Sequence, residues 1–285
     1  MIYYFGYGSN LSETALRAKG VQPVKSDRAI LTHWRLTFDV PDFFRIEGGA
    51  GNIEPYKDED VHGVLYHCHE EDLPALDELE AIDVAYERKT MKIITYADEE
   101  IEAYVYIGLP ERVAPGYQPS RRYLNILIRG AKEQNLDPRY IAKLRAKEVR
   151  ATSHISPFRM PSSTDKRYTL KDLENSKTHT AFAGAVFDMS QARSDHDFLK
   201  NFFAGQDMTI FFLKRMDCTD GKESLTDIIS DSLSNTQKQH LTAYLHEFAR
   251  EYRFAGRMDY EVNLDLELQI QSALSNRGSE EIRSR

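Results

Sequence analysis

The sequence predicts an α+β protein whose first half forms a barrel-like antiparallel sheet with flanking helices. Short apolar segments alternate with turns as far as residue 110, and helical patterns follow. This mixed pattern with hairpins favours a barrel-like sheet over a doubly wound Rossmann sheet. Ser156-Pro157 and Met160–Thr164 then break the pattern, as a linker does. We expect a first domain over residues 1–150, a linker over 151–165, a second domain over 166–260, and a C-terminal helix and tail over 261–285.

The chain opens with an aromatic strand, predicted for residues 2–7, that runs into a Gly-Ser-Asn turn. Aromatic residues favour a half-buried pleated surface. Gly8 permits a sharp turn, and Ser9 and Asn10 suit the start of a helix over Glu13–Ala18. Successive backbone N–H groups at such a turn form a small anion cradle. The turn is therefore a candidate site for a carboxylate.

The remaining elements of the first domain follow from apolar periodicity. Apolar runs predict strands, and Asp98-Glu99-Glu100 marks a polar hairpin turn between the last two. Leu124, Ile128 and Ala131 fall on one face of a helix. The predicted strands are Ala29–Phe38, Val61–His67, Thr90–Tyr96 and Ile101–Ile107, and the predicted helices are Glu70–Leu79, Ser120–Gln134 and Pro138–Lys147.

The second domain is predicted to mix helices and strands as well. Thr169 is a candidate N-cap, Ala183–Met189 reads as a strand, and Phe202–Asp207 is an aromatic run with a glycine turn. Thr236–Phe248 has the apolar face of an amphipathic helix, and Glu261–Ser275 predicts one more helix.

Composition argues against several classes of protein. The 285 residues carry a net charge of -8, which gives no support for nucleic-acid binding. No apolar run is long enough to span a bilayer, and the first residues lack the pattern of a signal peptide. Cys68 and Cys218 lie far apart and do not indicate a disulfide framework. We therefore expect a cytoplasmic protein with no membrane or nucleic-acid partner.

Four motifs in order resemble the gamma-glutamylcyclotransferase family over about residues 2–150. The aromatic strand leads into Tyr7-Gly8-Ser9-Asn10-Leu11, and the Gly-rich Gly48–Pro55 precedes a Gly-Val-Leu-Tyr strand at residues 63–66. Leu76-Asp77-Glu78-Leu79-Glu80 follows, with Tyr86 six residues later, and Tyr123 with Gly130–Glu133 completes the set. The resemblance implies a small β-barrel with flanking helices and the release of 5-oxoproline from a γ-glutamyl amine or amino acid.

The resemblance assigns the catalytic base to Glu80, which matches the glutamate of the family's Asp-Glu-x-Glu segment. Cyclisation needs a base for the α-amine, a folded-back substrate and stabilisation of the tetrahedral oxygen. A carboxylate in a partly apolar cleft suits the role of base. The alternative is that Glu80 is a solvated residue on an acidic surface helix. Asp77 and Glu78 are expected to cap or solvate the turn.

The substrate-binding candidates lie on the turn and on two tyrosines. Gly8, Ser9 and Asn10 would offer backbone N–H groups to the glutamyl carboxylate, and the hydroxyls of Tyr86 and Tyr123 would bind substrate. Otherwise these residues form an ordinary capped turn and partly buried tyrosines. The full predicted set is Glu80 as base and Tyr7, Gly8, Ser9, Asn10, Leu11, Tyr86 and Tyr123 as binding residues.

We predict neither a metal nor another cofactor. His67 and His69 share a face of a strand while Cys68 points away, and no further ligands stand at a spacing typical of zinc. The reaction itself requires no metal or redox group.

The second region, about residues 166–260, resembles the cytochrome b5-like fold, nearest to its membrane-associated progesterone-receptor branch. The matching segments are the Tyr-Thr-x-x-x-Leu opening at Tyr168, Gly184–Ser190, Phe203–Asp207 and the helix that ends in Phe254-Ala255-Gly256. The His-Pro-Gly-Gly loop and the tyrosine that bind haem in those proteins have no counterpart, and His196 is the one nearby ligand type. We therefore expect the fold without haem.

Three hypotheses follow: a gamma-glutamylcyclotransferase, a non-catalytic protein that binds a small ligand, and a haem-regulated cyclotransferase. Glu80 at the matching position favours the first. The sequence leaves open the amine that departs, the role of the second domain and the oligomeric state, because many γ-glutamyl compounds present the same glutamyl end.

Overall fold

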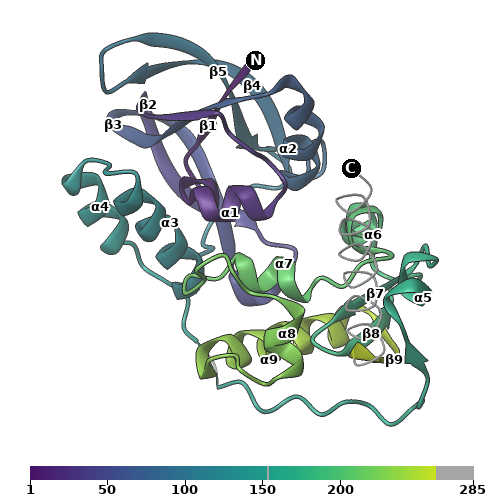
Figure 1. The fold of residues 1–285 in the computed structure, drawn as a ribbon. Helices are drawn as coiled ribbons and strands as arrows, with labels where there is room; N and C mark the ends of the chain where they lie inside the picture. Colours follow the sequence, from purple (N-terminus) through teal and green to yellow (C-terminus); the bar gives the residue numbers. More distant parts are fainter. Residues whose placement is uncertain (153, 261–285) are drawn as a thin grey trace, which may run out of the picture. The chain divides into compact units, whose positions relative to one another are not determined.

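The computed structural model describes residues 1–152 and 154–260, which fall into two compact units (Figure 1). The barrel unit consists of residues 1–155 and Phe211–Lys222. The C-terminal unit consists of Ser156–Ile210 and continues from Glu223. The sequence analysis did not anticipate that residues 211–222 belong with the first unit. The helix and tail expected over 261–285 lie outside the described residues.

Five strands close into a barrel in the order β1-β3-β2-β4-β5, which confirms the expected barrel. All neighbours are antiparallel except β1 and β5, which meet in parallel at Tyr4 and Tyr104. Large apolar side chains such as Phe5, Leu65 and Ile93 fill the core. The strands are β1 (Ile2–Gly6), β2 (Lys25–Pro41), β3 (Gly49–Cys68), β4 (Tyr86–Thr95) and β5 (Glu100–Gly108).

The long pairing of β2 with β3 contains a bulge that the alternation of side chains explains. Ala29 and Leu31 are buried before the bulge, whereas Leu36 and Phe38 are buried after it. The buried positions therefore change from odd to even numbers, and an unbroken strand would expose one of the two sets. The register shifts between Thr32 and Trp34, where His33 adopts a φ of 63°. The bulge keeps both halves of β2 facing the core.

Short helices flank the barrel. Ser12 and Ser120 cap α1 and α3 by accepting hydrogen bonds from backbone N–H groups of the first turn, and Asp137 does the same for α4. The buried face of α3 is formed by Leu124, Leu127 and Ala131, while Ile128 is only half-buried. The elements are 3-10 helices η1 (Ser9–Leu11), η2 (Arg45–Glu47) and η3 (Glu70–Asp72), and α-helices α1 (Glu13–Ala18), α2 (Leu73–Leu79), α3 (Arg121–Glu133) and α4 (Pro138–Arg145).

Gly130 lets α3 approach the turn after β1 closely. A Cβ at this position would lie 2.4 Å from the backbone of Leu11 and Ser12. Such a distance leaves no room for a side chain, so glycine is required for the contact. A second face of α3 carries Arg122, Asn125 and Arg129, at spacings of three and four residues.

The segment Phe211–Lys222, which we call the arm, packs against that second face. Arg129 Nη1 donates to the backbone oxygens of Asp217 at 3.1 Å and Thr219 at 2.8 Å. The side chain of Asn125 donates to that of Asp217 at 2.8 Å, and Arg122 donates to the Arg215 oxygen at 3.1 Å. The arm begins within helix α7 (Thr209–Lys214).

The C-terminal unit is built on a four-stranded sheet in the order β6-β9-β8-β7. Phe182, Phe187 and Phe248 stack in its core, and Thr169 caps α5 in a reciprocal capping box. The elements are β6 (Arg167–Tyr168), α5 (Leu170–Glu174), β7 (His179–Phe182), β8 (Ala185–Asp188), η4 (Ser194–His196), α6 (Asp197–Phe203), α8 (Leu225–Ile229), α9 (Asn235–Glu251) and β9 (Arg253–Met258).

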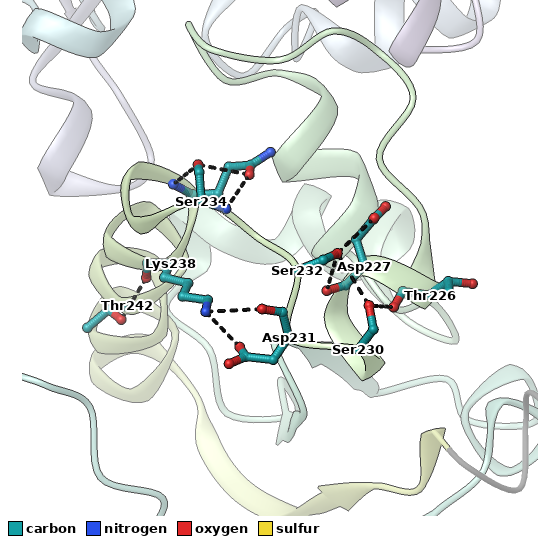
Figure 2. A network of polar contacts seen from close by, with 9 residues as sticks. Thr226, Asp227, Ser230, Asp231, Ser232, Ser234, Lys238 and Thr242 are labelled. Carbon is teal, nitrogen blue, oxygen red and sulfur yellow. Dashed lines mark hydrogen bonds and ion pairs between the residues drawn. The ribbon is translucent and has the colours of Figure 1, made fainter.

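A polar network joins α8 to α9 (Figure 2). Lys238 pairs with the Asp231 carboxylate at 2.9 Å, and Ser230 Oγ donates to the backbone oxygen of Thr226 at 2.7 Å. Ser234 caps α9 in a reciprocal box with Gln237. Each contact satisfies a helix end or a turn, so the network explains local structure and not chemistry.

The histidine singled out as a potential haem ligand is buried and hydrogen-bonded on both ring nitrogens. His196 Nδ1 lies 2.9 Å from the Tyr252 hydroxyl, and Nε2 lies 2.8 Å from Arg193. A ligand to iron would have to give up one of these contacts. Within residues 1–152 and 154–260, no helix is both long and apolar enough to cross a bilayer.

Candidate active site

Glu80 is held at the end of α2 by the backbone turn that follows it. The N–H of Ile82 donates to Asp77 O at 3.0 Å, and that of Ala81 donates to Glu78 O at 3.1 Å. This pair of bonds is a Schellman motif, which needs a left-handed residue just after the cap. Ala81 takes that conformation, with a φ of 49°. Glu80 is thus the C-cap residue, at a position set by the main chain.

Asp77, one turn earlier, anchors α2 to the barrel wall. Its Oδ1 accepts a hydrogen bond from the Tyr106 hydroxyl at 2.7 Å, and its Oδ2 pairs with Arg88. Asp77 was expected to cap or solvate the turn, but its side chain instead joins the helix that bears Glu80 to β4 and β5. Glu78 is exposed.

The turn after β1 and the end of α2 meet through one buried amide. Asn10, which is 3% exposed, donates from Nδ2 to Glu80 Oε1 at 2.6 Å and to the Tyr4 hydroxyl at 2.6 Å. The backbone oxygen of Asn10 accepts from the Tyr66 hydroxyl at 2.8 Å. The two motifs that lie 70 residues apart in sequence therefore form one site.

Lys19 completes this cluster, and sequence reasoning missed it. It follows the last turn of α1, and its side chain is 4% exposed. Its Nζ donates to Asn10 Oδ1 at 2.8 Å and lies 3.8 Å from Glu80 Oε1. Burial lowers the pKa of Lys19 to about 8, with the Glu80 carboxylate opposing and Arg215 reinforcing that shift. A single lysine in a surface-like helix gave no signal of burial.

A second cluster surrounds Gly51 of the Gly-rich segment. The Gly51 N–H donates to the Tyr123 hydroxyl at 3.0 Å, and the Tyr86 hydroxyl donates to Gly51 O at 2.9 Å. The Ser9 backbone also hydrogen-bonds the Tyr123 oxygen and lowers its pKa. A Cβ at Gly8 would lie 3.3 Å from that oxygen. The turn, the Gly-rich segment and α3 thus converge on the Tyr123 hydroxyl.

Burial, with a smaller contribution from the Glu80 charge, raises the pKa of several tyrosines near Glu80. Burial raises the pKa of Tyr4, Tyr7, Tyr86 and Tyr123, in the last case to about 12, and the Glu80 carboxylate raises each further. Burial also raises the pKa of Tyr106, and the Asp77 and Glu80 carboxylates raise it further. All five hydroxyls are therefore neutral donors around one carboxylate at neutral pH.

The other sequence-predicted residues have structural roles. The Tyr7 hydroxyl donates to Tyr106 O at 2.5 Å, and Leu11 is fully buried beneath the turn. Leu11 and Ser12 use their N–H groups within η1, on Gly8 O and Ser9 O. The N–H groups of Leu11 and Ser12 are thus used within the turn itself, whereas Gly8 lies beside Tyr123 of the Gly51 cluster.

The Asp42 carboxyl, which has a raised pKa, lies near the Gly51 cluster. Burial and the neighbouring Glu47 carboxylate raise the pKa of Asp42 to about 6, against a hydrogen bond from the Phe44 N–H and the charges of Arg215 and Arg122. The Asp42 charge in turn raises the pKa of Tyr86 and Tyr123. No sequence motif marked Asp42.

His67 and its neighbours are not arranged as a metal site. His67 Nε2 lies 2.9 Å from Asp27 Oδ2, Cys68 is buried, and His69 begins η3. Across the part of the chain that the structure describes, no three His, Cys, Asp or Glu side chains are grouped to hold a metal ion.

Comparison with known proteins agrees with the N-terminal motifs. Residues 60–144 match the model of the AIG2-like family. Gamma-glutamylcyclotransferases of Mus musculus and Homo sapiens are each 30% identical over 149 residues, which is 51% of this chain and 78% of theirs. The gamma-glutamyl cyclotransferase gliK of Claviceps purpurea is 29% identical over 138 residues, 45% of this chain and 62% of its own. A solved gamma-glutamyl cyclotransferase structure is 26% identical, with a TM-score of 0.48 over 54% of this chain and 93% of that one.

The closed barrel brings the Tyr-Gly-Ser-Asn turn and the Glu80 carboxylate together. The chain belongs, over its N-terminal half, to the AIG2-like/gamma-glutamylcyclotransferase family. The cytochrome b5-like resemblance of the second region rests on its sequence motifs alone and stays a prediction.

Proposed function

We propose that this protein is a gamma-glutamylcyclotransferase that converts a γ-glutamyl amine or amino acid into 5-oxoproline and the free amine, with Glu80 as general base. The observation that carries the proposal is the 2.6 Å hydrogen bond from Asn10 to Glu80. It brings the matched glutamate against the matched turn, which the reading of Glu80 as a solvated surface residue does not predict. The side chain of Glu80 is only 17% exposed.

The chemistry moves two protons from the attacking nitrogen to the departing nitrogen. Glu80 takes the first proton from the substrate's α-ammonium group, and the resulting amine attacks the γ-carbonyl carbon to close a five-membered ring. Glu80 passes this proton to the departing nitrogen as the bond from that nitrogen to the carbon breaks and the carbonyl re-forms, and it then takes the second proton from the ring nitrogen to leave a neutral lactam. The second proton passes to the free amine, which departs as an ammonium ion, so Glu80 ends as a carboxylate and the reaction consumes no co-reactant.

Asn10 orients the base for this step. Its amide holds Glu80 Oε1, which directs the second oxygen of the carboxylate, Oε2, toward the substrate. A base that is fixed in one orientation accepts its proton without a search over rotamers. The nearby tyrosines have raised pKa values, so their neutral hydroxyls do not compete with Glu80 as a base.

The Gly51 cluster is the proposed binding site of the glutamyl α-carboxylate. The Tyr123 oxygen accepts from the N–H of Gly51 and from the Ser9 backbone, so its proton must point to a third group. A substrate carboxylate can accept that proton. We assign Tyr86 the task of fixing the Gly51 peptide, because its hydroxyl already donates to Gly51 O. We place the action of the protein in a reducing cytoplasm, in keeping with Cys68 and Cys218 forming no disulfide.

Glu80→Gln tests the proposal. The amide keeps an oxygen for Asn10 but cannot accept the ammonium proton, so we expect kcat to fall by about 100- to 10,000-fold. Purified protein is incubated with a panel of γ-glutamyl amino acids and amines, and 5-oxoproline is followed by mass spectrometry. Glu78→Gln, on the exposed side of the same helix, is the matched control and keeps wild-type activity.

Wild-type turnover by the Glu80→Gln variant would contradict the assignment of the base. Wild-type protein that binds a γ-glutamyl compound in calorimetry and releases no 5-oxoproline would make it a ligand-binding protein instead.

A further inference from the structure

We propose that Lys19 is a positioning residue that holds the side-chain amide of Asn10 in the orientation in which it donates to Glu80. The inference rests on the proposed function, because it takes Glu80 to be the base. It adds a residue that the sequence motifs do not mark and that touches neither substrate nor reacting atoms.

The argument starts from the two ends of the Asn10 amide. Oδ1 accepts from Lys19 Nζ at 2.8 Å, and Nδ2 donates to Glu80 Oε1 at 2.6 Å and to Tyr4 at 2.6 Å. An asparagine amide can rotate by 180° and exchange its oxygen and nitrogen. The rotated amide would place its oxygen against the Glu80 carboxylate and its NH2 group against the ammonium group. Both contacts would then be repulsive, so Lys19 and Glu80 together select one orientation.

Lys19 reinforces that selection, because only Glu80 among the other two partners of the amide distinguishes its oxygen from its nitrogen. Tyr4 has a hydroxyl, which can donate as well as accept and is therefore compatible with either face of the amide. The ammonium group of Lys19 can only donate. It remains mostly protonated at neutral pH, since burial lowers its pKa only to about 8.

The burial of Lys19 supports a specific role. A charged side chain that is 4% exposed loses most of its hydration, and that loss is tolerated where the charge is paired. Its direct distance to Glu80 Oε1 is 3.8 Å, beyond hydrogen-bond length, whereas the contact with Asn10 is a hydrogen bond. The hydrogen-bonded connection from Lys19 to the base therefore runs through Asn10.

A double-mutant cycle tests the proposal in the full-length protein with a γ-glutamyl substrate that the wild type turns over. We expect Lys19→Met to lower kcat by about 10- to 100-fold while KM changes less than about 3-fold, because the base is misplaced and the Gly51 cluster is intact. In an Asn10→Ala background, where there is no amide to orient, Lys19→Met should lower kcat by less than about 3-fold.

Two further variants separate orientation from general effects. Lys19→Gln loses the charge but keeps an NH2 donor for Asn10 Oδ1, so its kcat should lie above that of Lys19→Met. Arg17→Met removes an exposed cation from the same helix, where Arg17 pairs with Glu13, and should behave as wild type. If circular dichroism shows that Lys19→Met is unfolded, the cycle is run with Lys19→Gln.

Equal losses from the lysine substitution in the presence and absence of the Asn10 side chain would overturn the proposal. So would a Lys19→Met variant with wild-type kcat while Glu80→Gln is inactive, and in that case the proposed function would stand. Wild-type protein without turnover would overturn both.

Discussion

The position of Glu80 depends on the backbone conformation of the next residue, Ala81. Ala81 adopts the left-handed conformation that closes the Schellman motif, although a Cβ makes this conformation cost on the order of 1–2 kcal/mol. Glycine is the usual residue at this position, and because alanine stands there the sequence does not predict the motif. The family motif identified Glu80, but its cap position and its contact with Asn10 depend on backbone geometry that the sequence does not display.

The other site residues show where sequence reasoning ends. Asn10 and Tyr123 could be nominated because they lie in ordered motifs. Lys19 and Gly51 could not be assigned roles, because their importance comes from contacts between segments that only the closed barrel brings together. The expectation that Tyr86 binds substrate stays a prediction, and the structure adds a hydrogen bond from its hydroxyl to Gly51 O.

At the turn, we predict that Gly8→Val weakens every γ-glutamyl substrate alike. The new Cβ would stand 3.3 Å from the Tyr123 hydroxyl, and the two methyl groups beyond it would enter the space proposed for the carboxylate. We expect kcat/KM to fall by about 10- to 100-fold for all substrates. Tyr123→Phe, which removes the hydroxyl without adding bulk, is the companion variant. Loss for one substrate only would move the turn to the leaving-group pocket.

Asp42 should make stability depend on pH. Its pKa is raised from 3.8 to about 6, so between these values the folded protein holds a proton that the unfolded chain releases. Stability therefore falls as pH rises through this window, and the cost is fully present above pH 6. Asp42→Asn keeps an acceptor for the Phe44 N–H and should be more stable than wild type at pH 7 by on the order of 1–2 kcal/mol.

Urea unfolding of both proteins at pH 4 and pH 7 measures this difference. The advantage of the Asn variant should shrink toward pH 4, where the wild-type carboxyl is increasingly protonated. An Asn variant that is less stable than wild type at pH 7 would show that the Asp42 charge is favourable.

Among the elements, α3 connects three parts of the barrel unit. One face carries Leu124, Leu127 and Ala131 into the core, and Gly130 lies against the Leu11–Ser12 backbone. The other face donates to the arm through Arg122, Asn125 and Arg129. The sequence predicted this helix over Ser120–Gln134, but it placed Ile128 rather than Leu127 on the core face.

We predict that Gly130→Ala impairs catalysis through Tyr123 on the same helix. A Cβ at 2.4 Å from backbone atoms forces α3 away from the turn, which costs roughly 1–3 kcal/mol and displaces Tyr123 from Ser9. Thermal melting and kcat/KM should both fall. Lys132→Ala, at an exposed position of α3, controls for a change of side chain alone. Unchanged kcat/KM with a lowered melting temperature would show that the site tolerates movement of the helix.

β2 illustrates which features of an element sequence patterns reveal. The apolar alternation predicted a strand at Ala29–Phe38, and the structure has one from Lys25 to Pro41. The bulge lies inside the predicted range, and the extra residues, 25–28 and 39–41, lie at the two ends, where mostly polar residues and a proline give no apolar alternation. The same limitation applies to β3, whose first residues are the Gly-rich segment.

For the molecule as a whole, the division into units does not follow the sequence. Every residue of the proposed site lies between Tyr4 and Tyr123, yet the arm at Phe211–Lys222 belongs to the barrel unit. Composition and motifs cannot reveal this, because the arm has no motif of its own and makes its hydrogen bonds mostly through backbone oxygens.

We therefore predict that a fragment of residues 1–155 keeps cyclotransferase chemistry at low temperature but melts earlier than the full-length protein. Loss of the arm leaves the partly buried Arg122 and Arg129 without these backbone acceptors, and each such loss costs on the order of 1 kcal/mol. Calorimetry gives the melting temperatures of the two proteins, and 5-oxoproline release is compared at roughly 15–37 °C, below the usual melting range of a domain. A folded fragment without activity at any temperature would mean that the arm is part of the site.

The parallel pairing of β1 with β5 has a consequence for the order of events on the ribosome. Tyr104 is synthesised about a hundred residues after Tyr4, so at about 5–20 residues per second this edge of β1 waits several seconds for its partner. The Gly-Ser-Asn turn follows β1, and α2, which bears Glu80, is anchored through Asp77 to Tyr106 of β5. Enzymatic activity would thus be acquired at the final stage of barrel assembly, and its appearance during refolding would report on that closure directly.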